Sequence, residues 1–198
     1  MSKPEIILIG GGGHARSCID VIEQEGKYQI AGIVDEKITS DHVFNYSILG
    51  SDADLEKLRF RYNCALVAVG QIKTSDIRAR LFNHLRQLDF QIPVIVSPYA
   101  YVSRHAQIDM GTIVMHNALI NANSKIGKNC IINSKVLLEH DSVIEDHCHI
   151  STAAVINGGS KIKEGSFVGS NATVIEYVSS RPNDFIKAGS VFKGYNNE

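Results

Sequence analysis

The stretch that decides the fold is residues 120–144, INANSKIGKNCIINSKVLLEHDSVI, in which an aliphatic side chain returns at every sixth position. The same phase runs through Val96, Val102, Ile108, Val114, Ile120, Ile126, Ile132, Leu138, Ile144, Ile150, Ile156, Ile162, Val168 and Val174. The fourth residue after each of these is small or β-branched, as at Ala118, Cys130 and Ser142. A helix needs a period near 3.6 and an ordinary strand a period of 2, so this pattern predicts short flat strands joined by corners and stacked coil upon coil.

The period resembles the left-handed parallel β-helix of the hexapeptide-repeat acyltransferases, in which three faces make one coil. By this resemblance residues 96–174 form roughly four and a half coils, more than the minimum of about three that a solenoid needs for a core. Cys130 and Cys148 then fall in one core ladder with Ser166. The four cysteines show no CxxC spacing, so we expect free thiols rather than disulfides or a metal site.

The pattern is interrupted after Val174. Residues 177–184 carry Pro182 and place Ser180 in the aliphatic position, which predicts a loop that protrudes from the solenoid. Ile186 returns to the phase, and the tail that follows it is expected to cap the open end of the stack.

The N-terminal third shows the alternation of strands and helices that is typical of a small Rossmann-like unit. Its predicted elements are strands of a parallel sheet over residues 5–9, 28–34, 65–69 and 94–96, and helices over 16–25 and 75–88. We therefore expect two domains, an α/β domain over residues 1–95 and an all-β solenoid over residues 96–198.

The glycines at 10–13 join the first strand to the first helix, and Asp35 follows the second strand. Glycines let a phosphate approach the backbone, and a helix N-terminus offers unpaired N–H groups with a partial positive charge. An anionic nucleotide group is the expected ligand, with His14 as a further hydrogen-bonding group. The same residues also fit a tight turn without a ligand, and the match of the glycines and Ala15 to a dinucleotide fingerprint is weak.

The composition is that of an ordinary globular protein. Its 20 Lys and Arg residues nearly balance its 21 Asp and Glu residues, so there is no basic excess that would favour nucleic acid. No apolar run approaches the roughly 18 residues of a bilayer-spanning helix, and the first five residues do not fit a signal peptide. We therefore expect a cytoplasmic protein without membrane insertion.

Histidine is the main candidate for chemistry, and a cluster of histidines lies within the repeat. His140 follows the inward Leu138 by two positions, so its ring is expected near a corner, pointing outward. A neighbouring carboxylate, Asp141 or Glu139, is suited to orient the ring and stabilise the imidazolium of a general base. His149 lies half a coil further on and is expected to meet the His140 face of a neighbouring subunit.

The chain resembles the sugar acetyltransferase family that includes sialic acid O-acetyltransferases and the N-acetyltransferases of UDP-linked 4-amino sugars. The resemblance covers nearly the whole chain and is carried by Gly-Gly-Gly-Gly-His at 10–14, Val-Asp at 34–35, Val-Ala-Val-Gly at 67–70, Leu-Glu-His-Asp at 138–141 and His-Ile-Ser at 149–151. It implies a homotrimer with active sites between subunits, acetyl-CoA as co-substrate, no metal, a nucleotide sugar on the N-terminal domain, and a role in bacterial surface-glycan biosynthesis.

The resemblance also implies roles for single residues. His140 matches the catalytic base and Asp141 its supporting acid, while His149 and Gly158 match contacts to acetyl-CoA. The matches to sugar-nucleotide contacts are Gly12, Gly13, His14, Asp35 and Gly70. The implied reaction is direct transfer to a sugar amine or hydroxyl, with His149 or a backbone N–H stabilising the oxyanion.

One motif departs from the pattern of many hexapeptide acetyltransferases. Their solenoid ends with a Gly-x-Pro-Ala segment beside the CoA site, whereas residues 187–194 read KAGSVFKG and contain no proline. The resemblance therefore gives no account of how this tail meets the distal part of CoA.

We do not expect Cys148 to act as a nucleophile, because burial among apolar side chains raises the pKa of a thiol.

Three other functions also fit parts of the sequence. A zinc enzyme of the carbonic-anhydrase type would use His140, His147 and His149, but the close His-x4-His spacing of that family is missing. A nicotinamide-dependent reductase would use the glycine-rich turn, although the α/β domain is short for two halves of a dinucleotide fold. A catalytically silent nucleotide-sugar-binding protein is the third, and an O-acetyltransferase of free or CMP-linked sialic acid is an alternative within the resembled family.

Overall fold

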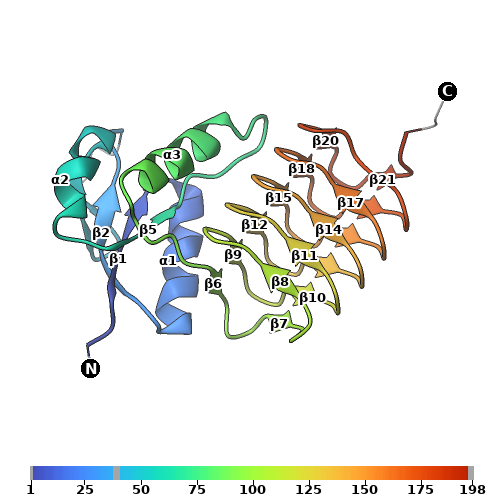
Figure 1. Ribbon diagram of the computed structural model, residues 1–198, viewed down its shortest axis with the longest axis horizontal. Helices are drawn as coiled ribbons and strands as arrows, with labels where there is room; N and C mark the ends of the chain where they lie inside the picture. The colour runs from blue at the N-terminus through green and yellow to red at the C-terminus, as the bar shows by residue number, and fades with distance from the viewer. Residues whose placement is uncertain (1, 38–40, 196–198) are drawn as a thin grey trace.

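The computed structural model of the protein describes residues 2–37 and 41–195, and it shows an α/β unit joined to a long solenoid (Figure 1). The α/β unit has one sheet of strand order β3-β4-β2-β1-β5. Its strands are β1 (Glu5–Ile9), β2 (Gln29–Val34), β3 (His42–Val43), β4 (Tyr46–Gly50) and β5 (Cys64–Val67). Its helices are α1 (Gly13–Glu25), α2 (Leu55–Arg59), α3 (Asp76–Gln87) and the 3-10 turn η1 (Asp52–Asp54).

Alternation along β1 decides which helix covers which face of this sheet. Ile6 and Leu8 pack with buried residues of α1, whereas Ile7 and Ile9 pack with buried residues of α3 and α2. Gly10 ends β1 with a φ of 104°, and a Cβ there would lie 2.5 Å from a methyl carbon of Val69, so only glycine fits this turn. The chain can therefore pass directly from the sheet into α1.

The solenoid is a left-handed parallel β-helix with three faces. Face 1 holds β7 (Tyr101–Val102), β10 (Leu119–Ile120), β13 (Leu137–Leu138), β16 (Val155–Ile156), β19 (Thr173–Val174) and β21 (Val191–Phe192). Face 2 holds β8 (Gln107–Ile108), β11 (Lys125–Ile126), β14 (Val143–Ile144) and β17 (Lys161–Ile162). Face 3 holds β6 (Ile95–Val96), β9 (Ile113–Val114), β12 (Ile131–Ile132), β15 (His149–Ile150), β18 (Phe167–Val168) and β20 (Phe185–Ile186).

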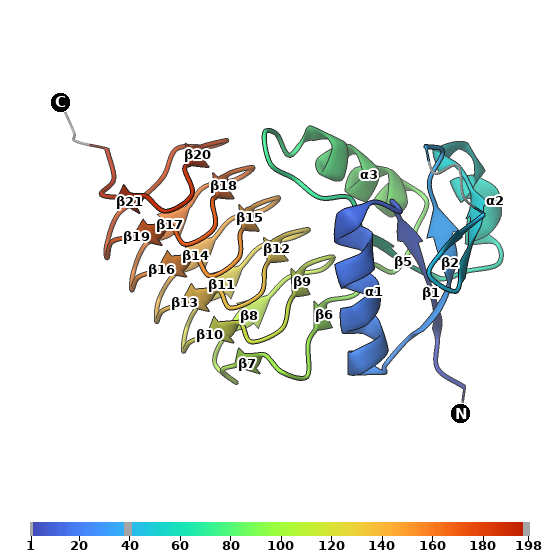
Figure 2. The same ribbon diagram turned by 180° about the vertical axis from the view of Figure 1, so that it is seen from behind.

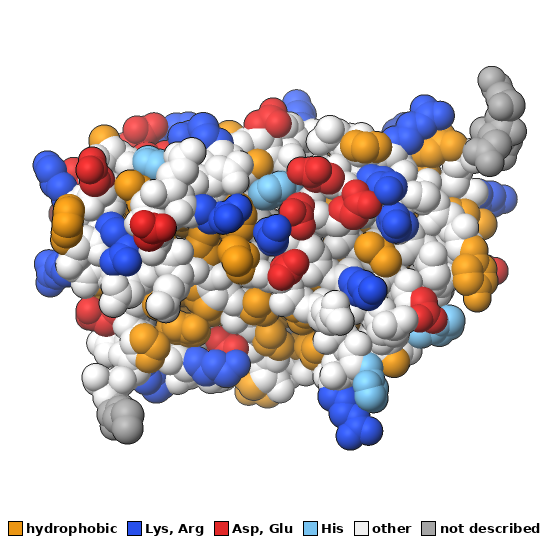
Figure 3. Space-filling view, in the orientation of Figure 1, with side chains coloured by type: hydrophobic (Ala, Val, Ile, Leu, Met, Phe, Trp, Pro, Cys, Tyr) orange, Lys and Arg blue, Asp and Glu red, His pale blue; other side chains and the backbone are white. Residues whose placement is uncertain are grey.

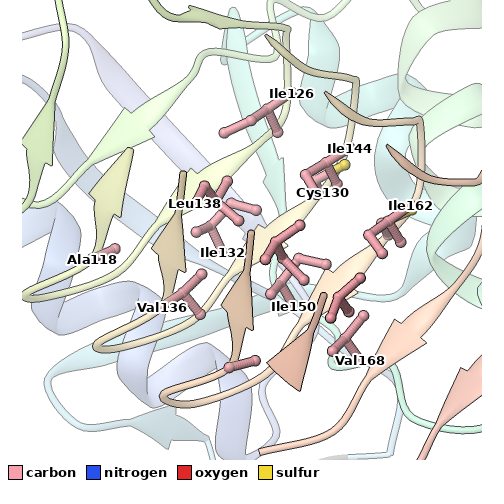
Figure 4. Packing of buried hydrophobic residues seen from close by; sticks show 14 of the residues in the cluster. Ala118, Ile126, Cys130, Ile132, Val136, Leu138, Ile144, Ile150, Ile162 and Val168 are labelled. Carbon is pink, nitrogen blue, oxygen red and sulfur yellow. The ribbon is translucent and has the colours of Figure 1, made fainter. Parts of the chain in front are cut away.

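Stacking of the coils confirms the predicted repeat. Leu119 pairs with Leu137, and Leu137 with Val155, so each strand pairs with the strand one full coil further along. The aliphatic residue of each six points inward, where Ile132, Ile150 and their counterparts form one buried column (Figure 4). Burial of one such side chain contributes about 1.5–3 kcal/mol, so the column is the main source of solenoid stability.

From Gly111 to Gly189, each corner contains one residue in the left-handed conformation, and these residues also recur at every sixth position. They are Gly111, Asn117, Asn123, Asn129, Lys135, Asp141, His147, Ala153, Gly159, Gly165, Asn171, Tyr177, Asn183 and Gly189. Most are glycine, asparagine or aspartate, the residues that tolerate this conformation best. Corner 1–2, between faces 1 and 2, contains Asn123, Asp141, Gly159 and Tyr177, and corner 2–3 contains Asn129, His147 and Gly165.

Two local predictions were wrong. Residues 94–96 do not join the α/β sheet, because Ile95 pairs with Ile113 on face 3 and so belongs to the repeat. Residues 177–184 do not protrude: Ser179 bridges to Lys161 on face 2. Ser180 is buried in the aliphatic position, and its hydroxyl accepts the N–H of Lys163, so this polar side chain fits a core position.

Helix α1 lies between the α/β sheet and face 3 of the solenoid (Figure 2). The outward isoleucines of face 3, Ile95, Ile113 and Ile131, share one hydrophobic cluster with α1 and with β1. All four cysteines are buried free thiols, as predicted. In the described part of the chain, no helix has the length and apolarity that crossing a membrane requires.

Candidate active site

A cavity of about 700 Å³ opens where β1, β2 and β5 end and the α/β unit meets the solenoid. The carboxyl ends of parallel strands are the usual ligand site of open α/β sheets. The cavity brings together residues from both parts of the chain: Gly12, Gly13, His14, Asp35, Gly70, Gln71, Ile72, Arg80, Asn133 and His149 are among its lining residues. All five residues that the sequence assigns to sugar-nucleotide binding thus lie in one place.

The glycine loop presents bare backbone to this cavity. A Cβ on Gly12 or Gly13 would meet no atom within 4 Å, so the space beside both residues is open. Helix α1 starts at Gly13 without a side-chain cap and without an acidic residue in its first turn. Asp35 holds the loop in place, because its carboxylate accepts the N–H of Gly11 at 2.8 Å and that of Lys37 at 2.7 Å. These features give the site the character of an anion-binding helix N-terminus.

His14 is half-buried in the wall of the cavity, and one of its ring nitrogens has no partner. Its Nε2 is inaccessible to solvent and makes no hydrogen bond among the described residues. Burial, and secondarily the positive charge of Arg78, lower the pKa of His14 to about 3, so its ring is neutral. A buried nitrogen without a partner is costly, and a ligand in the cavity is the natural group to satisfy it.

His149 reaches the same cavity from face 3 of the solenoid. Its Nδ1 donates to the backbone carbonyl of Gln71 at 2.6 Å, and its Nε2 accepts from Asn133 Nδ2 at 3.3 Å. Burial lowers the pKa of His149 to about 4, although the bond to Gln71 opposes this shift. The ring is therefore neutral with its lone pair on Nε2, which makes that nitrogen an acceptor.

Sequence reasoning did not identify Gln71 and Arg78, which join the cavity wall to the solenoid. The Gln71 amide donates to the carbonyl oxygens of His147 and Gly165. The buried Arg78 guanidinium donates to the Val69 carbonyl and to Asn129 Oδ1, and no carboxylate pairs with it in the described structure. Arg78 had no sequence signal because it lies among the apolar positions of an amphipathic helix.

His140 lies on corner 1–2, away from this cavity. Its Nδ1 donates to Asp141 Oδ2 at 2.8 Å, and the histidine side chain is 55% exposed. Asp141 also accepts from Asn123 Nδ2, and these two bonds lower the pKa of its carboxyl group. An imidazole whose Nδ1–H is held by a carboxylate keeps its lone pair on Nε2, which is the tautomer that a general base needs.

Gly158 lies directly against the His140 ring. A Cβ at Gly158 would be 2.7 Å from His140 Cε1 and 2.8 Å from its Nε2. The ring can keep its position only because residue 158 has no side chain. The structure thus groups His140, Asp141 and Gly158 on one corner, and places His149 with the α/β residues instead.

The three histidines of the zinc alternative do not converge within the chain. His147 lies on corner 2–3, where its Nδ1 is hydrogen-bonded to Asn129 and its ring packs on Phe82. His149 is bound to Gln71 and His140 to Asp141. No group of three potential metal ligands occurs among residues 2–37 and 41–195.

Comparisons with known proteins agree with this architecture. A family model described as the PglD N-terminal domain matches residues 5–85. A histidine-to-asparagine mutant of perosamine N-acetyltransferase from Caulobacter crescentus, in complex with CoA and GDP-perosamine, is 30% identical with a TM-score of 0.92, and the match covers 98% of this chain and 90% of that one. The acetyltransferase domain of PglB from Neisseria gonorrhoeae is 26% identical with a TM-score of 0.88, covering 97% and 92%.

A second structure of the Neisseria domain, in complex with acetyl coenzyme A, is 25% identical with a TM-score of 0.83 and covers 96% of both chains. The comparison with curated proteins gives no match. The first of these similarities extends over nearly the full length of both chains and includes the α/β unit as well as the solenoid. The chain therefore belongs to the hexapeptide-repeat sugar acetyltransferases and is an acyltransferase.

Proposed function

We propose that this enzyme transfers the acetyl group of acetyl-CoA to an amino group of a nucleotide-linked sugar, with His140 as the general base. The observation that carries the proposal is the His140–Asp141 pair, which leaves a free Nε2 lone pair on an exposed corner. The relatives support the substrates, because one was crystallised with CoA and GDP-perosamine and another with acetyl coenzyme A.

The nucleotide sugar is assigned to the cavity of the α/β unit. Gly12 and Gly13 offer backbone N–H groups to its diphosphate, and His14 offers an unpartnered nitrogen. Asp35 fixes the glycine loop, while Gly70 leaves room beside His14, since a Cβ there would be 3.4 Å from His14 Cβ. On this assignment residues 1–95 bind the sugar and residues 96–198 carry out acetyl transfer.

A homotrimer would bring the two sites together. The outer side chains of face 1 include Tyr101, Leu119, Leu137, Val155 and Val191, which form an apolar column at the edge of which His140 lies. Face 2 is polar by contrast, and in the view of Figure 3 acidic and basic side chains are interspersed over it. We assign face 1 to contact with another copy, whose cavity then receives His140 of the neighbour, with acetyl-CoA between them.

The chemistry of the pair follows from this arrangement. The sugar amine attacks the thioester carbon while His140 Nε2 removes its proton, and the imidazolium is stabilised by Asp141. Collapse of the tetrahedral intermediate expels the CoA thiolate, which takes that proton from His140, and leaves the amide. We assign the oxyanion to a backbone N–H near Gly158, because His149 Nε2 is an acceptor; His149 then contacts the acetyl-bearing end of the donor from the cavity wall.

The product, an N-acetylated nucleotide sugar, is suited to bacterial surface-glycan biosynthesis. The test is a panel of GDP-, UDP- and CMP-linked amino sugars and free sialic acids, incubated with acetyl-CoA while thiol release is followed. We expect turnover with a nucleotide-linked amino sugar, and a loss of about 10²–10⁴-fold in kcat for His140→Asn with unchanged binding of acetyl-CoA. Turnover with hydroxyl acceptors alone would contradict the amine assignment, and an active His140→Asn variant would contradict the base.

A further inference from the structure

The corner that carries His140 also carries an aromatic residue in an unfavourable backbone conformation. Tyr177 has a φ of 56°, whereas the other left-handed residues of corner 1–2 are Asn123, Asp141 and Gly159. A bulky residue in this region costs about 1–3 kcal/mol and persists where the surroundings or a function require it. The Tyr177 side chain does not recover this energy by burial, because the residue is 78% exposed.

The ring of Tyr177 is nevertheless held in a defined place. It lies on Gly159, where a Cβ would be 2.5 Å from its Cδ1 and 2.6 Å from its Cε1. The adjacent Gly158 supports the ring of His140 in the same way. The backbone N–H of Tyr177 donates to the Gly158 carbonyl, and that of Gly159 donates to the His140 carbonyl. The two adjacent glycines of one coil thus leave space for two rings, that of His140 from the coil before and that of Tyr177 from the coil after.

We propose that Tyr177 is a positioning residue for the acetyl donor, and that its ring supports the pantetheine arm of acetyl-CoA. This inference rests on the proposed function, which places the thioester carbon beside His140 Nε2. The backbone of Tyr177 lies two coils beyond that of His140, but both rings lie at the coil between them, the His140 ring on Gly158 and the Tyr177 ring on the adjacent Gly159. A chain of methylenes and amides that leaves the thioester along this corner passes over the exposed ring.

The opposite direction along the corner offers no such support. One coil before His140, the corner contains Asn123, whose amide is bound to Asp141. Beyond His140, the corner instead presents the exposed aromatic ring of Tyr177, which lies on Gly159. A flat ring suits a linear amide chain, because it provides contact area at a low cost in side-chain entropy.

The experiment exploits the opposite effects that Tyr177→Gly should have on stability and on donor binding. The variant relieves the left-handed strain, so its Tm should not fall below that of the wild type and should rise. Its KM for acetyl-CoA should increase about fivefold to tenfold with kcat changed less than twofold, since the ring contacts donor and transition state alike. Tyr177→Phe keeps the ring and should restore most of the affinity.

Two comparisons isolate the role of the ring. Lys135→Gly relieves the same conformation on the corner between faces 3 and 1, so it should raise Tm without changing any KM. S-acetyl-N-acetylcysteamine, a truncated donor, lacks the pantoate part of the arm, so its KM should rise less in Tyr177→Gly than the KM for acetyl-CoA does.

Three results would overturn the proposal: an unchanged KM for acetyl-CoA in Tyr177→Gly, an equal rise in KM for the truncated donor, or a rise in KM that accompanies dissociation of the oligomer in sedimentation experiments. Absence of acetyl transfer by the wild-type enzyme with every acceptor would instead overturn the proposed function.

Discussion

The two imidazoles of the cavity are kept neutral by the same surroundings. His14 and His149 line the cavity from different parts of the chain, and burial, with a smaller contribution from the positive charge of Arg78, disfavours a proton on either ring. A neutral imidazole offers one donor and one acceptor, so it can take part in recognition without binding an extra proton. At the residue scale, the cavity is therefore a polar site whose charge does not change near neutral pH.

This neutrality predicts a loss of stability in acid. The pKa of His149 is about 4 in the folded chain against 6.5 for an unperturbed histidine, so between these values the unfolded chain binds more protons. The free energy of unfolding should then fall as the pH drops from 6.5 toward 4, by up to about 3 kcal/mol from this group. Urea unfolding across this range should show a shallower pH dependence for His149→Gln than for the wild type.

A matched control for this experiment is Phe167→Leu, which changes the ring that packs on His149 at a centroid distance of 5.2 Å. That variant keeps the proton site at His149, so it should lower stability near neutral pH while retaining most of the pH dependence of the wild type. Parallel pH profiles for His149→Gln and the wild type would show that protonation of His149 does not contribute to acid unfolding.

At the scale of the element, the corners of the solenoid carry as much information as its strands. From Gly111 onward, each corner turns the chain from one face to the next through one left-handed residue, and Ala153 holds such a position with a φ of 57°. The next residue, Ala154, is fully buried in the core column. These two alanines are neighbours in the chain, but glycine substitution should have opposite effects on them.

Ala153→Gly should stabilise the protein by about 0.5–1 kcal/mol, because glycine adopts the left-handed conformation without steric cost. Ala154→Gly should destabilise it by about 1 kcal/mol, because it removes a buried methyl group and adds unfolded-state entropy. Both values come from urea or thermal unfolding of the two variants beside the wild type. Equal effects of the two substitutions would contradict the assignment of Ala153 to the strained corner position.

At the scale of the whole molecule, the proposed base and the cavity that we assign to the sugar lie on different parts of one chain. His140 is on corner 1–2, whereas the cavity with His14 and His149 lies where face 3 of the solenoid meets the α/β unit. On the proposed function, a reaction that needs both would use His140 of one copy with the cavity of another. This arrangement can be tested by mixing inactive copies.

The His140→Asn and His14→Ala variants should each lose activity, the first in kcat and the second through weaker sugar binding. Mixed, unfolded and refolded together, they should regain measurable acetyl transfer, because some sites then combine an intact His140 with an intact His14. The matched control is each variant refolded alone. If the mixture stays as inactive as the separate variants, each site is built within one chain.

The sequence predicted most of the fold because periodicity reports burial directly. The aliphatic phase located the solenoid strands, and the glycines at 10–13 located the first turn. The prediction from the aliphatic repeat was wrong at Ser180. A repeat of apolar residues does not reveal the hydrogen bond that lets a serine occupy a core position. The left-handed corners were also predictable, because many of them contain Asn or Gly and these residues recur at intervals of six.

The candidate site was predictable only in part. His14, Asp35 and Gly70 were placed in one cavity by the ends of neighbouring strands. The presence of His149 in that cavity, and the contacts of Gln71, depend on how the α/β unit is seated on face 3. That seating arises from packing between segments distant in sequence, and no local pattern encodes it.

The hydrophobic cluster that α1 shares with the isoleucines of face 3 has a consequence for the evolution of such proteins. A chain cut between the two parts would leave Ile113 and Ile131 uncovered on one fragment and the inner side of α1 on the other. Exchange of the α/β unit between related genes would therefore succeed only when the outward isoleucines of face 3 are exchanged with it. We therefore expect the residues that set acceptor preference and the first coils of the solenoid to be inherited together.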